Sequence, residues 1–535
     1  MDQSSRNRIQ LLLKDLAEGS SAPNKLLSEF AHILPTVKNA ENLALLSSTL
    51  ATSPMWHTSP IQSAYASLVT IAALQMSLER KRKITEPTIT LNVFISSILT
   101  ACLTAAPAAP STGCIIAGLL AGSVSPSTHP YQAEVPLYLQ SKLFKSYCSV
   151  ASAAPLSPVL AFAHTRVCTL NPDAPGDRIP ANLSHRMLTF MLNTLLFSPM
   201  GVLADKSAVP RAITDQTPSL TVATASCIVD LNAAEQTVLA LTQFLNTQSN
   251  RSQSETKTLV YIILTLLEHV ATQLLTSPRR PQKLPLMILD TLRNSSDLLL
   301  ERGIVSVGNV PAHDFAFLTA LKLLDSNSIA TLLHSILTTP IKRTPQTLFD
   351  LNCAEQIVSN NVSNTILAQL FEHCMQYARD MPITDKNRYW AEASHSVILA
   401  LLTQMSVLSP SGEFAAALHD YTTLLFDCFP ANGLSDHQYS LACGMVMQAA
   451  GSHDVVKGGA LAVELYNRMY ARLDSVPETR NAFEKTLQYA PPDVVVGGMQ
   501  RLYAQPAQAM PIIQGLDLER KEKALNWALS GRMNL

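Results

Sequence analysis

Charged residues are scarce in this chain. They make up 15% of its 535 residues, and acidic and basic side chains nearly cancel to a formal net charge of -1. Proteins that bind nucleic acid usually carry a clear basic excess, so we expect no nucleic acid partner. Hydrophobic residues reach 47%, unlike disordered chains, which combine low hydrophobicity with high net charge. The chain is also longer than one ordinary core supports, so we expect several units or one elongated array.

Paired cysteines and long apolar runs are missing as well. The nine cysteines stand singly, without a C-x-x-C pair, and we expect them to be buried small hydrophobic residues in a reducing compartment. The longest apolar runs, at residues 113–122 and 259–267, are about half of the roughly 18 residues that a membrane-spanning helix requires. We therefore predict that no segment spans a membrane.

Sequence signatures of catalysis are absent too. The chain contains no G-x-G-x-x-G, no G-x-x-x-x-G-K-[S/T], no G-x-S-x-G and no H-E-x-x-H. Such motifs cradle phosphates, expose a nucleophilic serine or bind zinc. We therefore predict no cofactor and no small-molecule substrate, and we assign no catalytic, cofactor-binding or metal-binding residue. The chain is predicted not to be an enzyme, and an enzyme with an unrecognised site is the less favoured alternative.

Two local features leave alternatives open. His373 and Cys374 are adjacent, as in half of a catalytic dyad or metal site, but neighbouring helix positions point about 100 degrees apart, which favours separate structural roles. The basic run ERKRK at residues 79–83 is a candidate nuclear localisation or anionic-lipid patch. The favoured alternative is a solvated helix end, because cations interact favourably with the C-terminal end of a helix dipole.

The chain is rich in helical periodicity. Apolar residues recur every three or four positions almost throughout, as in residues 24–37, where Asn24 is a candidate N-cap and Pro35 ends the run. Asn39 and Pro54 flank the next such segment. We find no confident strand pattern. Many short-linked helices cannot form one bundle but can stack as hairpins, so we predict an all-α fold, an irregular α-solenoid of stacked helical hairpins of the HEAT or ARM type.

Stretches rich in proline and serine suggest boundaries within this array. We expect N-terminal helical repeats over residues 1–105, a Pro/Ser-rich loop region over 106–136, middle helical repeats over 137–345 and C-terminal helical repeats over 346–535. No fixed period with fixed residues occurs. The array is therefore not expected to follow a TPR or ankyrin consensus.

Three parts of the chain resemble a known family. They are residues 25–54 together with ITEPTITLNVFISSIL at 84–99, GIVSVGNVPAHDFAFL at 303–318, and FPANGLSDHQYSLACGM at 429–445. Each is similar to a segment of the fungal peroxin 8 family of intraperoxisomal proteins, and the segments occur in the same order as in that family. The resemblance covers most of the chain.

The resemblance implies a non-enzymatic scaffold or adaptor in peroxisome biogenesis. Members of the family are thought to lie peripherally on the matrix side of the peroxisomal membrane and to bridge the receptor-docking complex and the RING-finger complex. The implied partners are import receptors and the peroxins of both complexes, with a role in cargo release from the receptor. The alternative is a HEAT-like scaffold subunit of a nuclear, trafficking or lipid-kinase complex.

The resemblance also directs attention to import signals. The chain ends in Met533, Asn534 and Leu535, a degenerate form of the C-terminal signal, which requires a small residue, a basic residue and leucine. An N-terminal type of signal is nearly matched at residues 25–33, where Lys25, Leu26, His32 and Ile33 occupy its four defining positions. The alternative for this second segment is an ordinary amphipathic helix with His32 on its surface.

Overall fold

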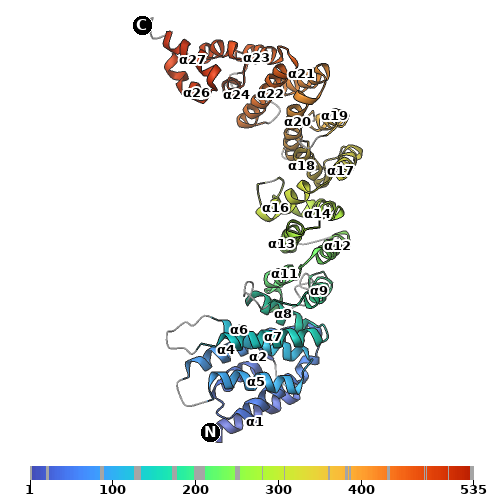
Figure 1. Cartoon of the computed structure of the whole chain (residues 1–535), viewed down its shortest axis with the longest axis vertical. Coiled ribbons are helices and arrows are strands. Elements are labelled where there is room, and N and C mark those ends of the chain that lie inside the picture. Colours follow the sequence, from blue (N-terminus) through green and yellow to red (C-terminus); the bar gives the residue numbers. More distant parts are fainter. Residues whose placement is uncertain are drawn as a thin grey trace. The chain divides into compact units, whose positions relative to one another are not determined.

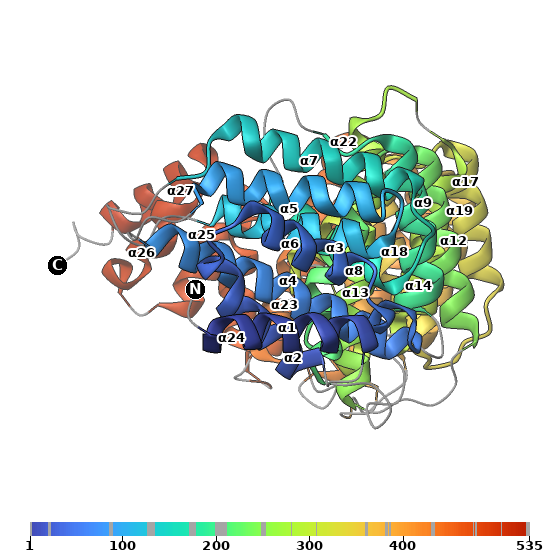
Figure 2. The same ribbon diagram turned by 90° about the horizontal axis from the view of Figure 1, so that it is seen from below.

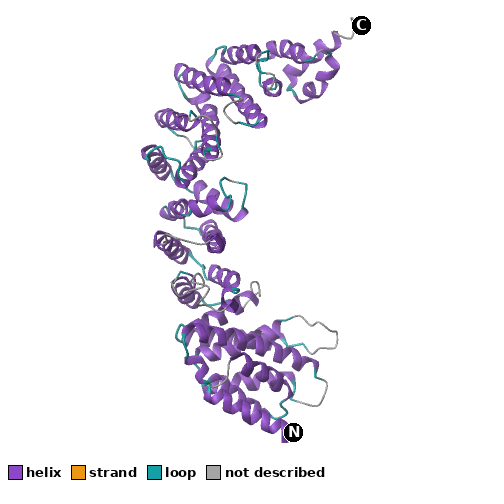
Figure 3. Cartoon of the chain, turned by 180° about the vertical axis from the view of Figure 1, so that it is seen from behind, coloured by secondary structure: helices purple, strands orange, loops and turns teal. Residues whose placement is uncertain are grey.

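The structure of this protein is a computed structural model. It describes residues 3–19, 23–84, 89–125, 134–170, 178–197, 211–247, 253–279, 281–306, 308–358, 362–379, 384, 387–429, 434–474, 476, 479–503 and 505–530. Every regular element within these residues is a helix, as the purple ribbons of Figure 3 show. The prediction of an all-α solenoid is confirmed.

The chain divides into two compact units. The first comprises Met1–Leu298 with Val310–Ala320, and the second comprises Leu299–Asn309 with Leu321–Leu535. Figure 1 labels most of the helices along the sequence. The division falls near residue 300, whereas the stretches rich in proline and serine predict boundaries near residues 106, 137 and 346.

The first unit is a stack of helices that pack on their neighbours in sequence and on the next pair. Its elements are α1 (Gln3–Glu18), α2 (Pro23–Ile33), η1 (Leu34–Thr36), α3 (Ala40–Ala51), η2 (Pro54–His57), α4 (Pro60–Lys83), α5 (Leu91–Ala105), α6 (Pro110–Val124), α7 (Leu137–Ala153), α8 (Pro158–Leu170), α9 (Ala181–Phe190), the π-helical η3 (Met191–Leu196), α10 (Arg211–Thr214), α11 (Thr217–Ser226), α12 (Leu231–Thr247), α13 (Gln253–Thr276) and α14 (Lys283–Asn294). Two further helices, α15 (Ser296–Glu301) and α16 (Pro311–Lys322), contain points where the chain passes between the units.

Helix α6 forms the centre of the N-terminal part of this unit. It packs against α4, α7 and α8, which are all labelled in Figure 2, and its residues from Ser111 to Ser123 are all buried. Glycine permits the close approach: a Cβ atom on Gly118 would lie 2.9 Å from Leu74 Cβ, and one on Gly122 would lie 2.9 Å from Leu78 Cβ. Real Cβ atoms do not approach side chains this closely, so α6 can reach α4 only through glycine.

The predicted loop region at residues 106–136 is therefore wrong for its central part. Pro110 stands at the first turn of α6, where its missing N–H costs nothing because no intrahelical acceptor is available there. A helix that is apolar on all sides has no amphipathic period. Composition alone could not distinguish this buried helix from a proline- and glycine-containing loop.

The second unit continues with helices stacked in the same manner. Its elements are α17 (Ser326–Thr338), α18 (Pro345–Ile357), α19 (Asn364–Ala378), α20 (Arg388–Leu408), α21 (Ser411–Cys428), α22 (Asp436–Lys457), α23 (Leu461–Arg472), α24 (Arg480–Thr486), α25 (Pro492–Leu502), η5 (Pro506–Ala509), α26 (Met510–Gly515) and α27 (Leu518–Ser530). Helix α20 packs against α18, α19 and α22, and α22 packs against α23 and α24.

Local capping signals explain several helix starts. Asn39 caps α3, since its Oδ1 accepts from the Glu41 backbone N–H at 2.7 Å. Ser435 and Gln438 form a reciprocal capping box at the start of α22, in which each side chain accepts a hydrogen bond from the backbone N–H of the other residue. Asn24, by contrast, does not cap α2. The helix already begins at Pro23, and the Asn24 side chain donates to Tyr65 of α4 instead.

Three helices contradict the expectation that no segment is long enough to cross a membrane. Among the described residues, α4, the Glu255–Thr276 part of α13, and α20 are long and apolar enough by length and composition, and α16 with α17 would add a fourth as a bent pair. These helices interleave serine, threonine and glutamine with apolar residues, so no uninterrupted apolar run in the sequence reveals their full length. In the structure, 56%, 56% and 61% of their respective apolar windows are buried inside the protein.

Candidate functional site

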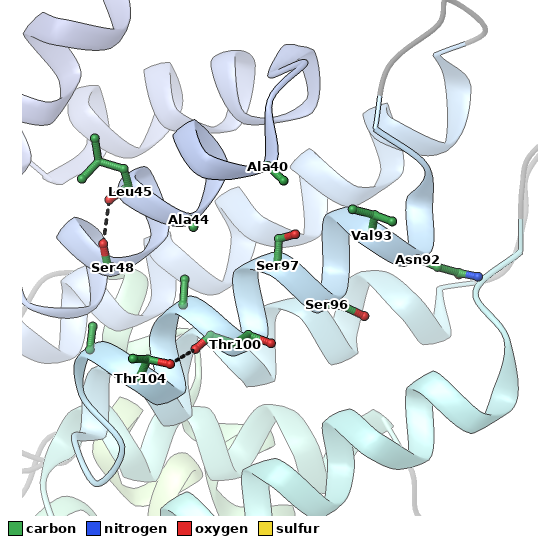
Figure 4. Close-up of a pocket in the computed structure, with 12 residues that line it drawn as sticks. Ala40, Ala44, Leu45, Ser48, Asn92, Val93, Ser96, Ser97, Thr100 and Thr104 are labelled. Atoms are coloured by element: carbon green, nitrogen blue, oxygen red, sulfur yellow. Dashed lines mark hydrogen bonds between the residues drawn. The ribbon is translucent and has the colours of Figure 1, made fainter.

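A broad groove lies across α3 and α5 in the first unit (Figure 4). Its volume is about 840 Å³, and small side chains line most of it. The lining residues are Ala40, Ala44, Leu45, Ser48, Asn92, Val93, Ser96, Ser97, Thr100, Ala101, Thr104 and Ala105. The two largest apolar side chains of this α3/α5 groove are exposed, Leu45 at 51% and Val93 at 45%.

The α3/α5 groove contains no titratable side chain. Some of its hydroxyl groups are already bonded to their own helices, as Ser48 Oγ donates to Leu45 O at 3.0 Å and Thr104 Oγ1 donates to Thr100 O at 2.8 Å. Threonine and serine that bond back to the preceding turn present little hydrogen-bonding capacity outwards. The groove therefore offers van der Waals contact and supplies no acid, base or nucleophile.

A smaller cleft between α21 and α23 in the second unit holds an arginine. Its volume is about 180 Å³. Arg468 donates to Thr422 Oγ1 at 2.9 Å and to Thr423 Oγ1 at 3.2 Å, and its guanidinium lies 5.5 Å from the centroid of the Phe426 ring. These contacts fix the orientation of the guanidinium at this Arg468 cleft.

A buried polar cluster joins α7, α8 and the residue after α11. Tyr147 Oη lies 3.1 Å from His164 Nδ1, and Cys227 Sγ lies 3.4 Å from His164 Nε2. Burial lowers the pKa of His164 to about 4 and raises the pKa of Cys227 above its usual range. A neutral imidazole bonded to a protonated thiol does not activate a nucleophile, so this cluster supports the interior of the stack.

A second buried histidine lies between α20 and α21. His395 Nδ1 is 3.0 Å from Tyr421 Oη, and burial lowers the pKa of His395 to about 4. Its Nε2 atom has no hydrogen-bond partner among the described residues. The imidazole is therefore held neutral in the core of the second unit.

The adjacent residues His373 and Cys374 lie in different surroundings on α19. Cys374 is fully buried, which raises the pKa of its thiol, whereas His373 is only partly buried and its ring meets the edge of Tyr377 at 5.7 Å. The two side chains thus lie on different faces of the helix. Within the part of the chain that the structure describes, no group of three or more His, Cys, Asp or Glu side chains is arranged to hold a metal ion.

The N-terminal import frame is folded into α2. Lys25 and His32 are exposed, Ile33 is partly buried, and Leu26 is only 2% exposed in the core of the first unit. His32 Nδ1 lies 2.5 Å from Arg80 Nη1 of α4. All four positions of the N-terminal frame therefore lie on one helix, but only Lys25 and His32 are exposed at the surface. The C-terminal signal, Met533, Asn534 and Leu535, lies outside the described residues.

The basic run at residues 79–83 is not a uniformly solvated helix end. Lys81 and Arg82 are 5% and 7% exposed. Arg82 donates to Ser123 O at 2.8 Å and to Ser125 O at 2.9 Å, and Lys81 donates to Pro35 O at 3.4 Å. Because Ser123 and Ser125 stand at the C-terminal end of α6, Arg82 caps a neighbouring helix. The expectation of a solvated run is wrong at these two positions, and their burial also removes them from a nuclear localisation patch.

Two arginines at surface cavities were not found by sequence reasoning. Arg468 lines the α21/α23 cleft, and Arg166 lines a cavity between α4, α8 and α11. Arg166 is the one arginine or lysine of α8, Arg468 shares α23 with Arg472, and neither lies in a recognised motif. Their partners come from other helices, so no signal within the local sequence could have identified them.

Comparison with known proteins identifies the middle of the chain. Residues 316–403, which extend from α16 into α20, match a family model described as the PEX8 central TPR-like domain. No curated protein matches the chain. The match agrees with the resemblance seen in the sequence and describes the repeats of this segment as TPR-like, although they lack a fixed consensus period.

Proposed function

The chain is identified as a peroxin 8, a protein of peroxisome biogenesis, and from this premise we propose that it is a non-enzymatic scaffold on the matrix side of the peroxisomal membrane. In this role it lies peripherally on the membrane and bridges the receptor-docking complex and the RING-finger complex. It also helps the import receptor to release its cargo. The match of residues 316–403 to the PEX8 central TPR-like domain carries the proposal.

The architecture supports a role in holding partners. Stacked helices expose long surfaces on which several partners can bind at the same time. Cavities occur in both units, namely the α3/α5 groove and the Arg166 cavity in the first and the Arg468 cleft in the second. None of them combines a nucleophile, a base that could activate it and donors for a developing negative charge, which together would favour catalysis.

Affinity purification of the full chain tests the bridging role. The tag belongs at the N terminus, because a C-terminal tag would block the carboxylate of Leu535. We expect peroxins of both membrane complexes to copurify from solubilised membranes. Recovery of only one complex would contradict bridging.

Removal of the protein tests the import role. We expect matrix enzymes to remain outside peroxisomes in cells that lack this chain, while peroxisomal membranes persist, and re-expression of the full chain to restore import. If matrix enzymes still enter peroxisomes in these cells, the proposed role in import is wrong.

A further inference from the structure

A small cavity opens between α4, α8 and α11 of the first unit, three helices that are labelled in Figure 1. Its volume is about 210 Å³. One part of its wall is apolar and includes Leu68, Ile71 and Phe162. Ile71 and Phe162 are buried, and Leu68 is packed against the core cluster that contains Phe162. A ligand in the cavity would therefore contact an apolar surface that is held in place by the core.

The remaining wall of this Arg166 cavity is polar. Arg166 of α8 donates from Nη2 to Gln75 Oε1 of α4 at 2.9 Å. The other end of the Gln75 amide donates to Glu79 Oε1 at 3.0 Å and to Ser125 Oγ at 3.4 Å. These bonds fix the orientation of the amide, with its oxygen towards the guanidinium. Arg166 is thus positioned by a neutral acceptor, and its other N–H groups have no acceptor among the described residues.

Among the residues that the structure describes, the Arg166 guanidinium has no anionic partner. Among the described residues, no carboxylate forms an ion pair with Arg166, and Glu79 bonds to the far end of the Gln75 amide. Gln216 and Ser219 at the start of α11 also line the cavity, where the helix dipole adds a partial positive charge. The polar side of the cavity is therefore positive and rich in hydrogen-bond donors.

We propose that the Arg166 cavity binds a peptide carboxylate attached to an aliphatic stem. The guanidinium would hold the carboxylate by charge-assisted hydrogen bonds, which a planar fork of donors forms in pairs. The aliphatic part would cover Leu68, Ile71 and Phe162. Two sources share this chemistry, the free C terminus of a peptide that ends in an aliphatic residue and a glutamate side chain within a peptide. The inference does not rest on the proposed function.

A binding assay with the full chain tests the proposal. The probe is a short fluorescein-labelled peptide that ends in leucine with a free carboxyl group, compared with its C-terminal amide and with an amidated peptide that carries an internal glutamate. Fluorescence polarisation should show saturable binding of the free acid or of the glutamate peptide, and the carboxylate that binds identifies the source. Absence of saturable binding for both, or equal binding of the plain amide, would overturn the proposal.

Variants of the cavity locate the binding. Arg166→Gln should weaken binding by about ten- to a hundredfold, because a charge-assisted bond is lost. Arg211→Gln is the matched control, since it removes the same charge from a side chain that is 92% exposed, and it should leave binding unchanged. Thr169→Glu, at an exposed lining position, should also weaken binding by placing a carboxylate near Arg166, and it keeps the test valid if Arg166→Gln does not fold. Unchanged binding in folded Arg166→Gln or Thr169→Glu would contradict the assignment.

Discussion

His164 and His395 are neutral imidazoles in the interiors of the first and the second unit, respectively. Burial lowers the pKa of each to about 4, whereas an unfolded histidine has a pKa of about 6.5. Between these two values the unfolded chain binds more protons than the folded chain. Stability is therefore fully present above pH 6.5 and is lost as the pH falls towards 4.

We expect each histidine to contribute a loss of roughly 3 kcal/mol across that interval. Urea unfolding followed by circular dichroism at pH 7 and at pH 4.5 measures the change. His164→Gln should be less stable at pH 7 but should lose less stability on acidification than the unsubstituted chain. An equal loss in both proteins would show that His164 is not the group responsible.

Arg82 illustrates a cation whose role depends on a neighbouring helix. We expect Arg82→Met to destabilise the first unit by about 2–4 kcal/mol, because two charge-assisted hydrogen bonds to the end of α6 are lost and Ser123 O keeps only the longer bond that Gln140 Nε2 donates at 3.4 Å. Thermal or urea unfolding measures this effect. The control is Lys83→Met, since Lys83 is exposed next to Arg82, and its effect should stay within about 0.5 kcal/mol. Equal effects of the two variants would contradict the capping role of Arg82.

Similar caps recur at the ends of other helices. Arg186 donates to Ser152 O and Ala154 O at the end of α7, and Arg480 donates to Leu502 O at the end of α25. The last carbonyl groups of a helix lack intrahelical donors and carry partial negative charge. A long basic side chain from another helix satisfies both needs, so part of the small basic content of this protein holds its helices together.

At the scale of elements, the contact between α4 and α6 depends on glycine. A Cβ atom on Gly118 would lie 2.9 Å from Leu74 Cβ and 3.2 Å from the Ile71 Cα atom, and neither can move without shifting α4. We expect Gly118→Ala to destabilise the first unit by about 1–3 kcal/mol through overpacking, despite the higher helix propensity of alanine.

The matched control for Gly118→Ala lies on the same helix. At Gly113 the nearest atom to an added Cβ is Leu160 Cδ1, at 2.9 Å, which is the end of a flexible side chain. Leu160 can change its rotamer more easily than α4 can shift, so Gly113→Ala should cost less than Gly118→Ala. Urea unfolding of both variants compares them, and a larger loss for Gly113→Ala would contradict this account of the packing.

At the scale of the whole molecule, three long apolar helices bear on how the protein is attached to a membrane. Helices α4, α13 and α20 meet the length and composition of membrane spans, yet more than half of each apolar window is buried against other helices. Insertion would expose the packed surfaces of their neighbours. We therefore expect the protein to be released from peroxisomal membranes at alkaline pH. Retention in the membrane pellet would show that one of these helices inserts.

The predicted C-terminal signal leads to a second expectation at this scale. Met533 stands where a small residue is preferred and Asn534 where a basic residue is preferred, so overpacking of about 1–3 kcal/mol and loss of a charged contact of about 0.2–1 kcal/mol should weaken receptor binding. A C-terminal peptide with Met533→Ser and Asn534→Lys should bind the import receptor about ten- to a thousandfold more tightly. Fluorescence polarisation checks this, and equal affinity of both peptides would contradict it.

Localisation of a variant without residues 533–535 then shows which signal the full chain uses. If localisation is unchanged, targeting relies on residues 25–33 or on a partner. The N-terminal frame is best tested by Lys25→Ala with His32→Ala, because both side chains are exposed. Leu26 is buried, so its substitution would confuse loss of a signal with loss of the fold.

The sequence by itself determined the all-α class and most helix positions, because periodicity and caps such as Asn39 and Ser435 act within a few residues along the chain. It also indicated the family, through short segments in a particular order. Only the tertiary structure decided that α6 is a buried helix, that Arg82 caps it, and that Arg166 lies beside Gln75, 91 positions away. Such contacts depend on which helices pack together. The sequence of one helix does not show which residues of another helix will face it.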